Sequence, residues 1–364
     1  MITCRLLLRW QKTVKESNRF HVKSLQTVPA KALLFGEYGL LKGGAAAVVL
    51  LPNFKFRVQF SIGHDDFIER NCTLRSDFLS RDVTLNDNSL RFGDSSKLTG
   101  EQRNLYCYLS QHQCALADSS LLAEIIESYS PAYGFGSSSA ILTAFHLFFE
   151  TSTSSAALEF TQLSREFWRK VYASLRLLQG RGSGYDVASQ VYGALLGAVH
   201  EPLLLSFNNQ GQTIENGIYE FLPEVSRLRI SHDELKRFGC FIETGIHSDT
   251  RAVLKSAHIQ NLDRAFFDSQ KFFASTFVKD PSYTTAAELC LAASQVAIKY
   301  GLLPQTPALK RFTKMCTQAR LPWKTMGAGY GDCLWVMATR DELNELLKEP
   351  GVSGLNIRFA FEDV

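Results

Sequence analysis

Apolar residues along the chain switch repeatedly between short continuous runs and helical spacing, which is typical of a protein built from both strands and helices. Residues 32–35, 45–51 and 121–126 are apolar runs of strand length. Residues 137–149 and 156–178 instead repeat their apolar side chains every three or four positions. We therefore predict an α+β fold, in which a β-rich first part leads into alternating strands and helices.

The second half of the chain predicts another sheet with helices around it. Apolar runs at 192–199, 201–207 and 238–245 favour strands. No internal repeat or low-complexity linker marks a boundary, which we place near residue 200. The remaining predicted elements are antiparallel strands within 54–92, helices over 100–117, 250–255, 262–277, 284–300, 309–318 and 341–347, and strands at 323 and 355–361.

The length of 364 residues favours two lobes with a cleft between them, and it provides ample material for a core. We expect an extension of uncertain order over 1–26, a first domain over 27–200 and a second over 201–364. The extension is basic, with Glu16 as its single acid, and its apolar patch is too short for a secretory signal. We leave it out of the fold prediction.

Composition excludes several classes of function. A formal net charge of +3, spread along the chain, gives no electrostatic footprint for nucleic acid. No apolar run is long enough to span a membrane. The eight cysteines form no CxxC pair and the histidines form no HExxH pair, so we expect reduced thiols, no zinc site and a cytoplasmic protein. A metal, if used, should arrive with a nucleotide.

The stretch ESYSPAYGFGSSSAILTAF, residues 127–145, has the pattern of a phosphate-binding loop. A predicted strand precedes it, Pro131, Gly134 and Gly136 break the chain, and a predicted helix follows. Glycines let the backbone approach an anion, and the first N–H groups of a helix favour negative charge. An ordinary turn with serine caps is the alternative, because such patterns also occur by chance.

Three further positions have both a chemical and a plain structural interpretation. Lys31, in the segment PAKALLF, could act on a ligand or blunt an exposed sheet edge. Asp186, after the glycines of GRGSGYD, could be a catalytic carboxylate or a helix cap favoured by the dipole. The glycines of KTMGAGYGDC could bring the backbone close to a ligand or form a tight turn.

Taken together, three glycine-bearing segments resemble the motifs of the GHMP small-molecule kinases, a family that includes galactokinase, homoserine kinase, mevalonate kinase and phosphomevalonate kinase. The segments are PAKALLFGEYGLLKGG, PAYGFGSSSA and KTMGAGYGDC, in the order that the family uses. The resemblance covers most of the chain. It implies a two-lobed fold, with an N-terminal lobe like ribosomal protein S5 and a ferredoxin-like C-terminal lobe.

The resemblance also implies an ATP-dependent kinase that uses Mg²⁺ and a small-molecule substrate, with a homodimer left open. Lys31 and Asp186 would be the catalytic residues, and Ser138, with Ser137 as second choice, would bind the metal. The positions matched to ATP binding are Pro131, Gly134, Phe135, Gly136, Ser137, Ser138 and Ser139. The positions matched to the substrate are Glu37, Tyr38, Arg181, Ser183, Gly184, Gly327, Ala328 and Gly329.

Within the family the sequence is most similar to phosphomevalonate kinase. Tyr38 follows Glu37 where mevalonate kinases usually carry His, and residues 171–179 lack the acid that mevalonate kinases place there. Ala30, Met326 and Tyr330 depart from the family pattern near the expected acceptor. An anionic acceptor would need cations, for which Arg181 is preferred over Lys23, Lys42 and Lys324.

Two alternatives stay open. Mevalonate, a sugar or homoserine could replace phosphomevalonate as the acceptor, with mevalonate the strongest of these. A catalytically silent protein of the same fold, sensing a metabolite or binding a partner, is the other alternative, but it would be expected to lose Lys31, Asp186 or the phosphate loop.

Overall fold

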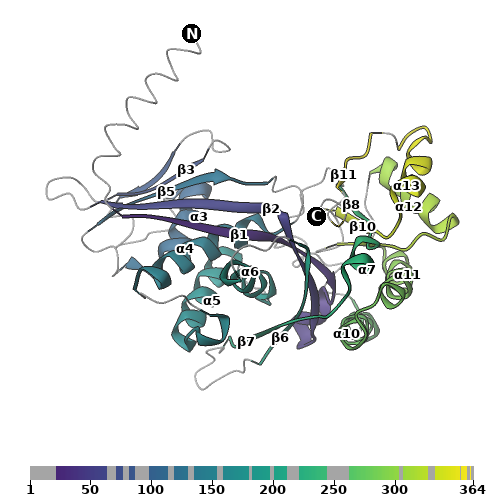
Figure 1. Cartoon of the computed structure of the whole chain (residues 1–364), viewed down its shortest axis with the longest axis horizontal. Coiled ribbons are helices and arrows are strands. Elements are labelled where there is room, and N and C mark those ends of the chain that lie inside the picture. The colour runs from purple at the N-terminus through teal and green to yellow at the C-terminus, as the bar shows by residue number, and fades with distance from the viewer. Residues whose placement is uncertain are drawn as a thin grey trace, which may run out of the picture.

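The computed structural model has two lobes, each built on its own sheet (Figure 1). In the described part of the chain, no helix has both the length and the apolar character needed to cross a membrane. The structure describes residues 22–63, 71–76, 82–86, 98–113, 119–129, 135–153, 159–179, 183–196, 201–210, 221–243, 262–302, 306–326, 333–352, 354–358 and 361.

The first lobe contains a seven-stranded mixed sheet organised around the long strand β2 (Ala46–Gly63). Strand β1 (Val22–Phe35) runs antiparallel along its whole length, with a register shift between Pro29 and Ala30. The first six residues of β2 are all buried, as expected for a strand segment covered on both faces. The other strands are β3 (Asn71–Ser76), β4 (Val83–Asn86), β5 (Ser120–Glu127), β6 (Leu203–Asn209) and β7 (Pro223–Arg227).

Four helices lie together on one side of the first sheet, three of them contacting its strands and the other packing mainly on neighbouring helices (Figure 1). The first of them begins with a capping box at Thr99. The Thr99 hydroxyl accepts a hydrogen bond from the backbone N–H of Gln102, and the Gln102 side chain accepts one from the backbone N–H of Thr99. The helix α4 packs on both β1 and β2 and is almost wholly buried between residues 140 and 149. The four helices are α3 (Gly100–Leu109), α4 (Ser137–Thr153), α5 (Arg165–Gln179) and α6 (Tyr185–Leu195).

The second lobe is a smaller antiparallel sheet between helices. Its strands follow the order β11-β8-β10-β9, and side chains alternate between two buried clusters, as a strand period of two requires. Trp335 faces the first lobe, whereas Leu334 and Val336 face α12 and α13. The elements are α7 (His232–Lys236), β8 (Cys240–Glu243), α10 (Arg264–Lys279), α11 (Tyr283–Lys299), α12 (Pro307–Gln318), β9 (Trp323–Thr325), β10 (Cys333–Val336), α13 (Arg340–Leu347) and β11 (Ile357–Arg358).

One buried hydrophobic cluster continues from the first lobe into the second. The ring of Phe35, at the end of β1, lies 5.1 Å from that of Phe277 on α10 and 5.6 Å from that of Trp335 on β10. Aromatic pairs at this separation add to the stability that their buried area provides. The two lobes therefore share a core at the end of β1.

The α+β fold class is confirmed, but some predicted elements are wrong. Residues 192–195 belong to α6 rather than to a strand, and β6 joins the first sheet beside β2 instead of starting a second sheet. Strand β1 already begins at Val22, inside the predicted extension. The division into two domains stays a proposal. Strand β7, which ends at Arg227, still pairs with β6 of the first sheet, so the strand pairing favours a domain boundary after Arg227 rather than near residue 200. The helix predicted at 250–255 lies outside the described residues.

Candidate active site

Lys31 lies in the middle of β1 with its side chain directed into the protein. It is only 5% exposed, so the interpretation as an exposed sheet-edge lysine is wrong. Its ammonium Nζ donates to the hydroxyl of Tyr185 at 2.8 Å, and its backbone N–H donates to the carbonyl of Phe135 at 3.1 Å. The second bond ties the strand to the predicted phosphate-binding loop, to which Phe135 belongs and which we call the phosphate loop.

The phosphate loop meets Lys31 at Gly136. This glycine has φ +80°, and a Cβ built on it would lie 2.6 Å from Cε of Lys31 and 2.9 Å from Oγ of Ser139. A side chain at this position would occupy the space that brings loop and lysine together. Pro131 and Gly134, also predicted for this loop, lie outside the described residues.

The helix α4 starts directly after Gly136, as the sequence predicts. Its first i to i−4 bond runs from the N–H of Ala140 to the carbonyl of Gly136, at 2.9 Å. The N–H groups of Ser137, Ser138 and Ser139 lie ahead of that bond, where helix geometry leaves them for an external acceptor. Ser138 is exposed and Ser139 is buried, its hydroxyl donating to the carbonyl of Gly136. Ser138, predicted to meet an anion or its metal, is therefore open to solvent at the start of α4.

Asp186 stands in the first turn of α6, beside the residue that holds Lys31. The helix is entered through Gly184 at φ +75°, where an added Cβ would lie 2.5 Å from the ring of Phe221. Asp186 is partly buried and accepts a bond from the N–H of Val187 at 3.1 Å, which fits a carboxylate at a helix N-terminus. Tyr185, which contacts Lys31, is the residue directly before Asp186, so both predicted catalytic residues lie near the start of α6.

Two buried polar residues of the site were missed by the sequence analysis. Gln190, one turn after Asp186, donates from Nε2 to the carbonyl of Pro29 at 3.2 Å and to that of Gly136 at 3.1 Å. Tyr129 donates to the carbonyl of Phe135 at 2.9 Å. Gln190 could have been predicted from the sequence, because it is a polar residue in an otherwise apolar helix and lies four positions after Asp186, on the same helix face. Gln190 joins β1, the phosphate loop and α6.

Glu37 and Lys324 form a buried ion pair between the lobes. Lys324 also donates to the carbonyl of Thr325 at 2.8 Å and is 4% exposed. Burial raises the pKa of the Glu37 carboxyl, and Lys324 partly offsets this. Tyr38 is buried against Phe266, with ring centroids 5.4 Å apart, beside a cavity of about 30 Å³. Both predicted substrate positions are therefore engaged within the protein.

The other predicted substrate positions are only partly described. Ser183, ahead of α6, is partly buried, whereas Arg181, Gly327, Ala328 and Gly329 lie outside the described residues. The residues present fit a magnesium ion carried by a nucleotide. Such an ion keeps water molecules and phosphate oxygens as ligands and needs few ligands from the protein. Ser138 offers such an oxygen at the loop. Among the described residues, no group of three or more His, Cys, Asp or Glu could hold a metal alone.

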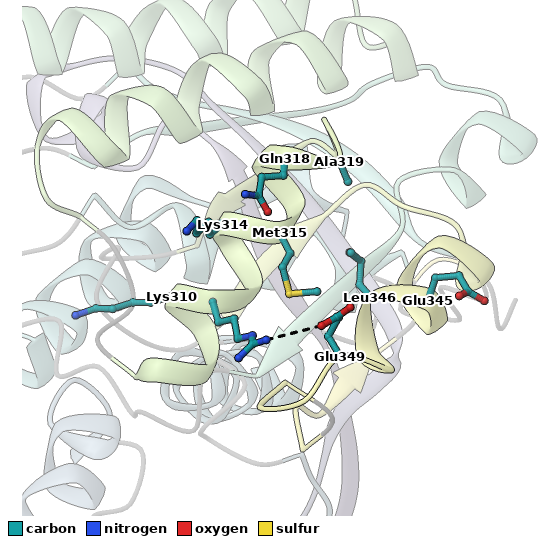
Figure 2. Close-up of a pocket in the computed structure, with 9 residues that line it drawn as sticks. Lys310, Lys314, Met315, Gln318, Ala319, Glu345, Leu346 and Glu349 are labelled. Atoms are coloured by element: carbon teal, nitrogen blue, oxygen red, sulfur yellow. Dashed lines mark ion pairs between the residues drawn. The ribbon is translucent and has the colours of Figure 1, made fainter.

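A separate groove of about 790 Å³ lies between α12 and α13 (Figure 2). Met315 and Leu346 form an apolar part of its lining, and Arg311 approaches Glu349 to 3.7 Å across it. It contains none of the predicted site residues. We therefore place the candidate active site at the meeting of β1, the phosphate loop and α6.

Comparison with solved structures shows that the chain has the fold of the GHMP kinases. The mevalonate kinase of Methanococcus jannaschii superposes with a TM-score of 0.64 at 16% identity, over 93% of this chain and 97% of that one. The phosphomevalonate kinase of Streptococcus pneumoniae, in complex with phosphomevalonate and AMPPNP, gives a TM-score of 0.60 at 16% identity, over 93% and 98%.

A sugar kinase has the same fold. Lactococcus lactis galactokinase, complexed with galactose, gives a TM-score of 0.59 at 14% identity, over 98% of this chain and 94% of that one. No family sequence model matches the chain, and no curated protein matches it. The likeness therefore rests on the fold.

Proposed function

We propose that the protein is an ATP-dependent small-molecule kinase that transfers the γ-phosphoryl group to phosphomevalonate, giving diphosphomevalonate. The observation that carries this proposal is the convergence of Lys31, Gly136 and the start of α6, linked by hydrogen bonds from Lys31 to both Tyr185 and Phe135. The fold shared with kinases, one of them complexed with AMPPNP, supports ATP as the phosphoryl donor.

Phosphoryl transfer asks the protein mainly for positioning and charge stabilisation. The N–H groups at the start of α4 would hold the ATP phosphates, and Lys31 would stabilise the charge of the transferring group. The attacking oxygen of the acceptor forms the new P–O bond while the bond to ADP breaks. Mg²⁺, held by the nucleotide and Ser138, would supply further charge neutralisation.

Asp186 would act on the acceptor. For an alcohol acceptor it would take the proton of the attacking hydroxyl as a general base. A phosphate acceptor is already anionic near neutral pH, so Asp186 would then act by orientation and electrostatics.

Mevalonate is the second candidate acceptor, because of one observation. Lys324, among the cations expected to meet the phosphate of phosphomevalonate, is buried in the ion pair with Glu37. Mevalonate carries a carboxylate but no phosphate, so its binding site would need fewer cationic side chains than that of phosphomevalonate. Arg181 remains the preferred partner for the phosphate in the first proposal.

An ADP-release assay with parallel acceptors tests the proposal. Purified protein receives ATP and Mg²⁺ with phosphomevalonate, mevalonate, galactose or homoserine, and ADP is measured by a coupled reaction. We expect release with phosphomevalonate. Release only with mevalonate would replace the acceptor, and release with none despite measurable ATP binding would indicate a catalytically silent protein of this fold.

Asp186→Asn tests the assigned catalytic carboxylate. The change keeps the shape but removes the charge, so we expect kcat to fall by at least about 100-fold. The dissociation constant for ATP, from titration calorimetry, should stay close to that of the unchanged protein. Asp233→Asn is the matched control, since Asp233 is an exposed acid in the first turn of α7. Near-native turnover in Asp186→Asn would reject the assignment.

A further inference from the structure

Tyr185 contacts the ammonium group of Lys31 in two ways. Its hydroxyl accepts the hydrogen bond from Nζ at 2.8 Å, and the same Nζ lies 4.6 Å from the centre of its ring. A lysine that is 5% exposed loses most of its hydration, and a buried ammonium without acceptors would be costly. Tyr185 therefore supplies part of the environment that keeps Lys31 charged inside the protein.

The tyrosine holds the lysine without neutralising it. Burial raises the pKa of the Tyr185 phenol, and Lys31 only partly opposes that rise. The phenol is thus protonated near neutral pH and acts as a neutral acceptor. A carboxylate in its place would form an ion pair and reduce the positive field of the lysine. Tyr185 itself leaves the lysine charged, and Cε of Lys31 lies 2.6 Å from the Cβ position of Gly136 in the phosphate loop.

Tyr185 is itself mounted on a fixed element. Gln190, on the same helix, donates to the carbonyl of Pro29 on β1 and to that of Gly136 on the phosphate loop. The carbonyl of Tyr185 also accepts from the hydroxyl of Ser189 at 2.6 Å. A reactive group held by packed, hydrogen-bonded neighbours keeps its geometry better than one held by a loop.

We propose that Tyr185 is a positioning residue, which aims the ammonium group of Lys31 at the terminal phosphoryl group of ATP. This inference rests on the proposed function. The residue acts through Lys31 and needs no contact with the substrate. Its hydroxyl is the essential part, since the ring alone retains the contact between cation and aromatic face but not the direction of the hydrogen bond.

The kinetic test uses Tyr185→Phe, which removes only the hydroxyl. We expect kcat to fall by about 10- to 100-fold, the range for a hydrogen bond to a charged group, while the KM values for ATP and acceptor change less than about threefold. Tyr192→Phe is the matched control. It lies two turns further along α6, where its ring packs on Phe160 with centroids 5.2 Å apart, and its kcat should not change.

Two kinetic outcomes would overturn the inference. A kcat within about threefold of the unchanged protein would show that the hydroxyl has no role in turnover. The second outcome is a rise in KM for ATP as large as the fall in kcat, seen in both Tyr185→Phe and Tyr192→Phe. It would show that the substitutions had only destabilised the packing of α6. Thermal unfolding of both variants separates that destabilisation from a local effect.

A second measurement does not depend on the acceptor. An acyl-phosphate derivative of ATP transfers its acyl group to a lysine amine near the phosphates, and mass spectrometry measures the labelling rate of Lys31. Only the neutral amine reacts, so the labelling rate is followed with rising pH to its plateau. We expect a plateau rate at least tenfold lower in Tyr185→Phe, and an unchanged plateau would reject the positioning role. If the protein turned over no acceptor but still showed this difference in labelling, the proposed function would be rejected and the positioning role of Tyr185 would stand.

Discussion

Gly136 is the residue at which the candidate site is most tightly constrained. Its φ of +80° is unfavourable for any residue with a Cβ, and its Cβ position is filled by Lys31 and Ser139. Two separate costs therefore oppose a side chain here, one from the backbone and one from crowding. A second glycine in the chain allows these costs to be separated.

Gly136→Ala should reduce turnover strongly. The added methyl group would push Lys31 or the start of α4 out of place, and a displacement near 1 Å can cost on the order of 100-fold in rate. We expect kcat to fall by about that factor in the ADP-release assay. The melting temperature should fall as well, because the left-handed backbone adds about 1–2 kcal/mol of strain.

Gly43→Ala is the matched control for the backbone cost. Gly43 has φ +76°, but a Cβ there would have no neighbour within 4 Å. We expect a similar loss of stability with native kcat. Equal kinetic losses in both variants would contradict the crowding argument at Gly136.

The sequence was enough to select candidate site residues, but not to predict what surrounds them. Lys31 and Asp186 could be chosen from the sequence because they stand at positions matched to the GHMP motifs, and their catalytic role stays a prediction. The contact between Lys31 and Tyr185 could not, since it joins residues 154 positions apart and depends on how α6 docks on β1. Burial of Glu37 with Lys324 depends in the same way on the approach of two lobes.

At the scale of elements, a buried histidine pair joins the turn after α3 to α4. Nε2 of His112 lies 2.8 Å from Nδ1 of His146, and His112 stacks on Phe149 with centroids 4.2 Å apart. Burial lowers the pKa of His112 to about 4, and Lys170 adds to this shift. Burial also lowers the pKa of His146 well below its usual value, with His112 and Lys170 adding to the shift. Both imidazoles are thus neutral in the folded protein near pH 7.

This pair should make stability depend on pH between about 7 and 5. The unfolded histidines bind protons below about pH 6.5 while the folded ones stay neutral, so the unfolded state gains protons and stability falls as pH falls. We expect a loss of about 2 kcal/mol per histidine from pH 7 to 5. The free energy of unfolding in urea at the two pH values measures it.

His112→Gln should remove about half of that pH-dependent loss, because His146 remains. His232→Gln is the control, since His232 lies near the surface, 3.5 Å from Glu201. If His112→Gln loses as much stability between pH 7 and 5 as the unchanged protein, the pair is not the source of the effect.

Elements whose periodicity agreed with their packing were predicted well. Strand β5, helix α4 and the helices α10 to α13 follow the sequence pattern within a few residues. The strand predicted at residues 192–195 was wrong, because a short apolar run fits a buried helix as well as a strand. The pairing of β6 with β2 could not be predicted, since strand order is set by contacts between distant segments.

At the scale of the whole molecule, the Glu37–Lys324 pair is a charged contact inside an otherwise apolar junction. Glu37 follows β1 and Lys324 lies on β9, so the pair spans the two lobes. Removing one member of a buried pair leaves the other charged and unsolvated, at a cost of about 3–5 kcal/mol. Lys324→Met should lower the free energy of unfolding by that amount in denaturant titration.

The control for this change is an exposed pair. Lys348→Met removes the partner of Glu345 at the surface of the second lobe, where we expect a loss of at most about 1 kcal/mol. The double variant Glu37→Gln with Lys324→Met should recover part of the single loss, because no charge is then left buried. Failure to recover would indicate lost packing rather than an unpaired charge.

The phosphate loop has its own contact with the second lobe. The ring of Phe135 lies 5.3 Å from that of Phe54 on β2 and 5.3 Å from that of Phe241 on β8. One wall of the loop is therefore supplied by a residue more than 100 positions further along the chain. The loop depends on the second lobe for its packing as well as on the strand and helix that flank it.

This contact limits how the protein can be recombined with its structural neighbours. A chimera that took its second lobe from another kinase of this fold would replace Phe241, and with it the surface against which Phe135 packs. Such a graft would keep Lys31, Ser138 and Asp186 and still change the packing of the phosphate loop. The two lobes therefore have to be exchanged together with the aromatic residues at their junction.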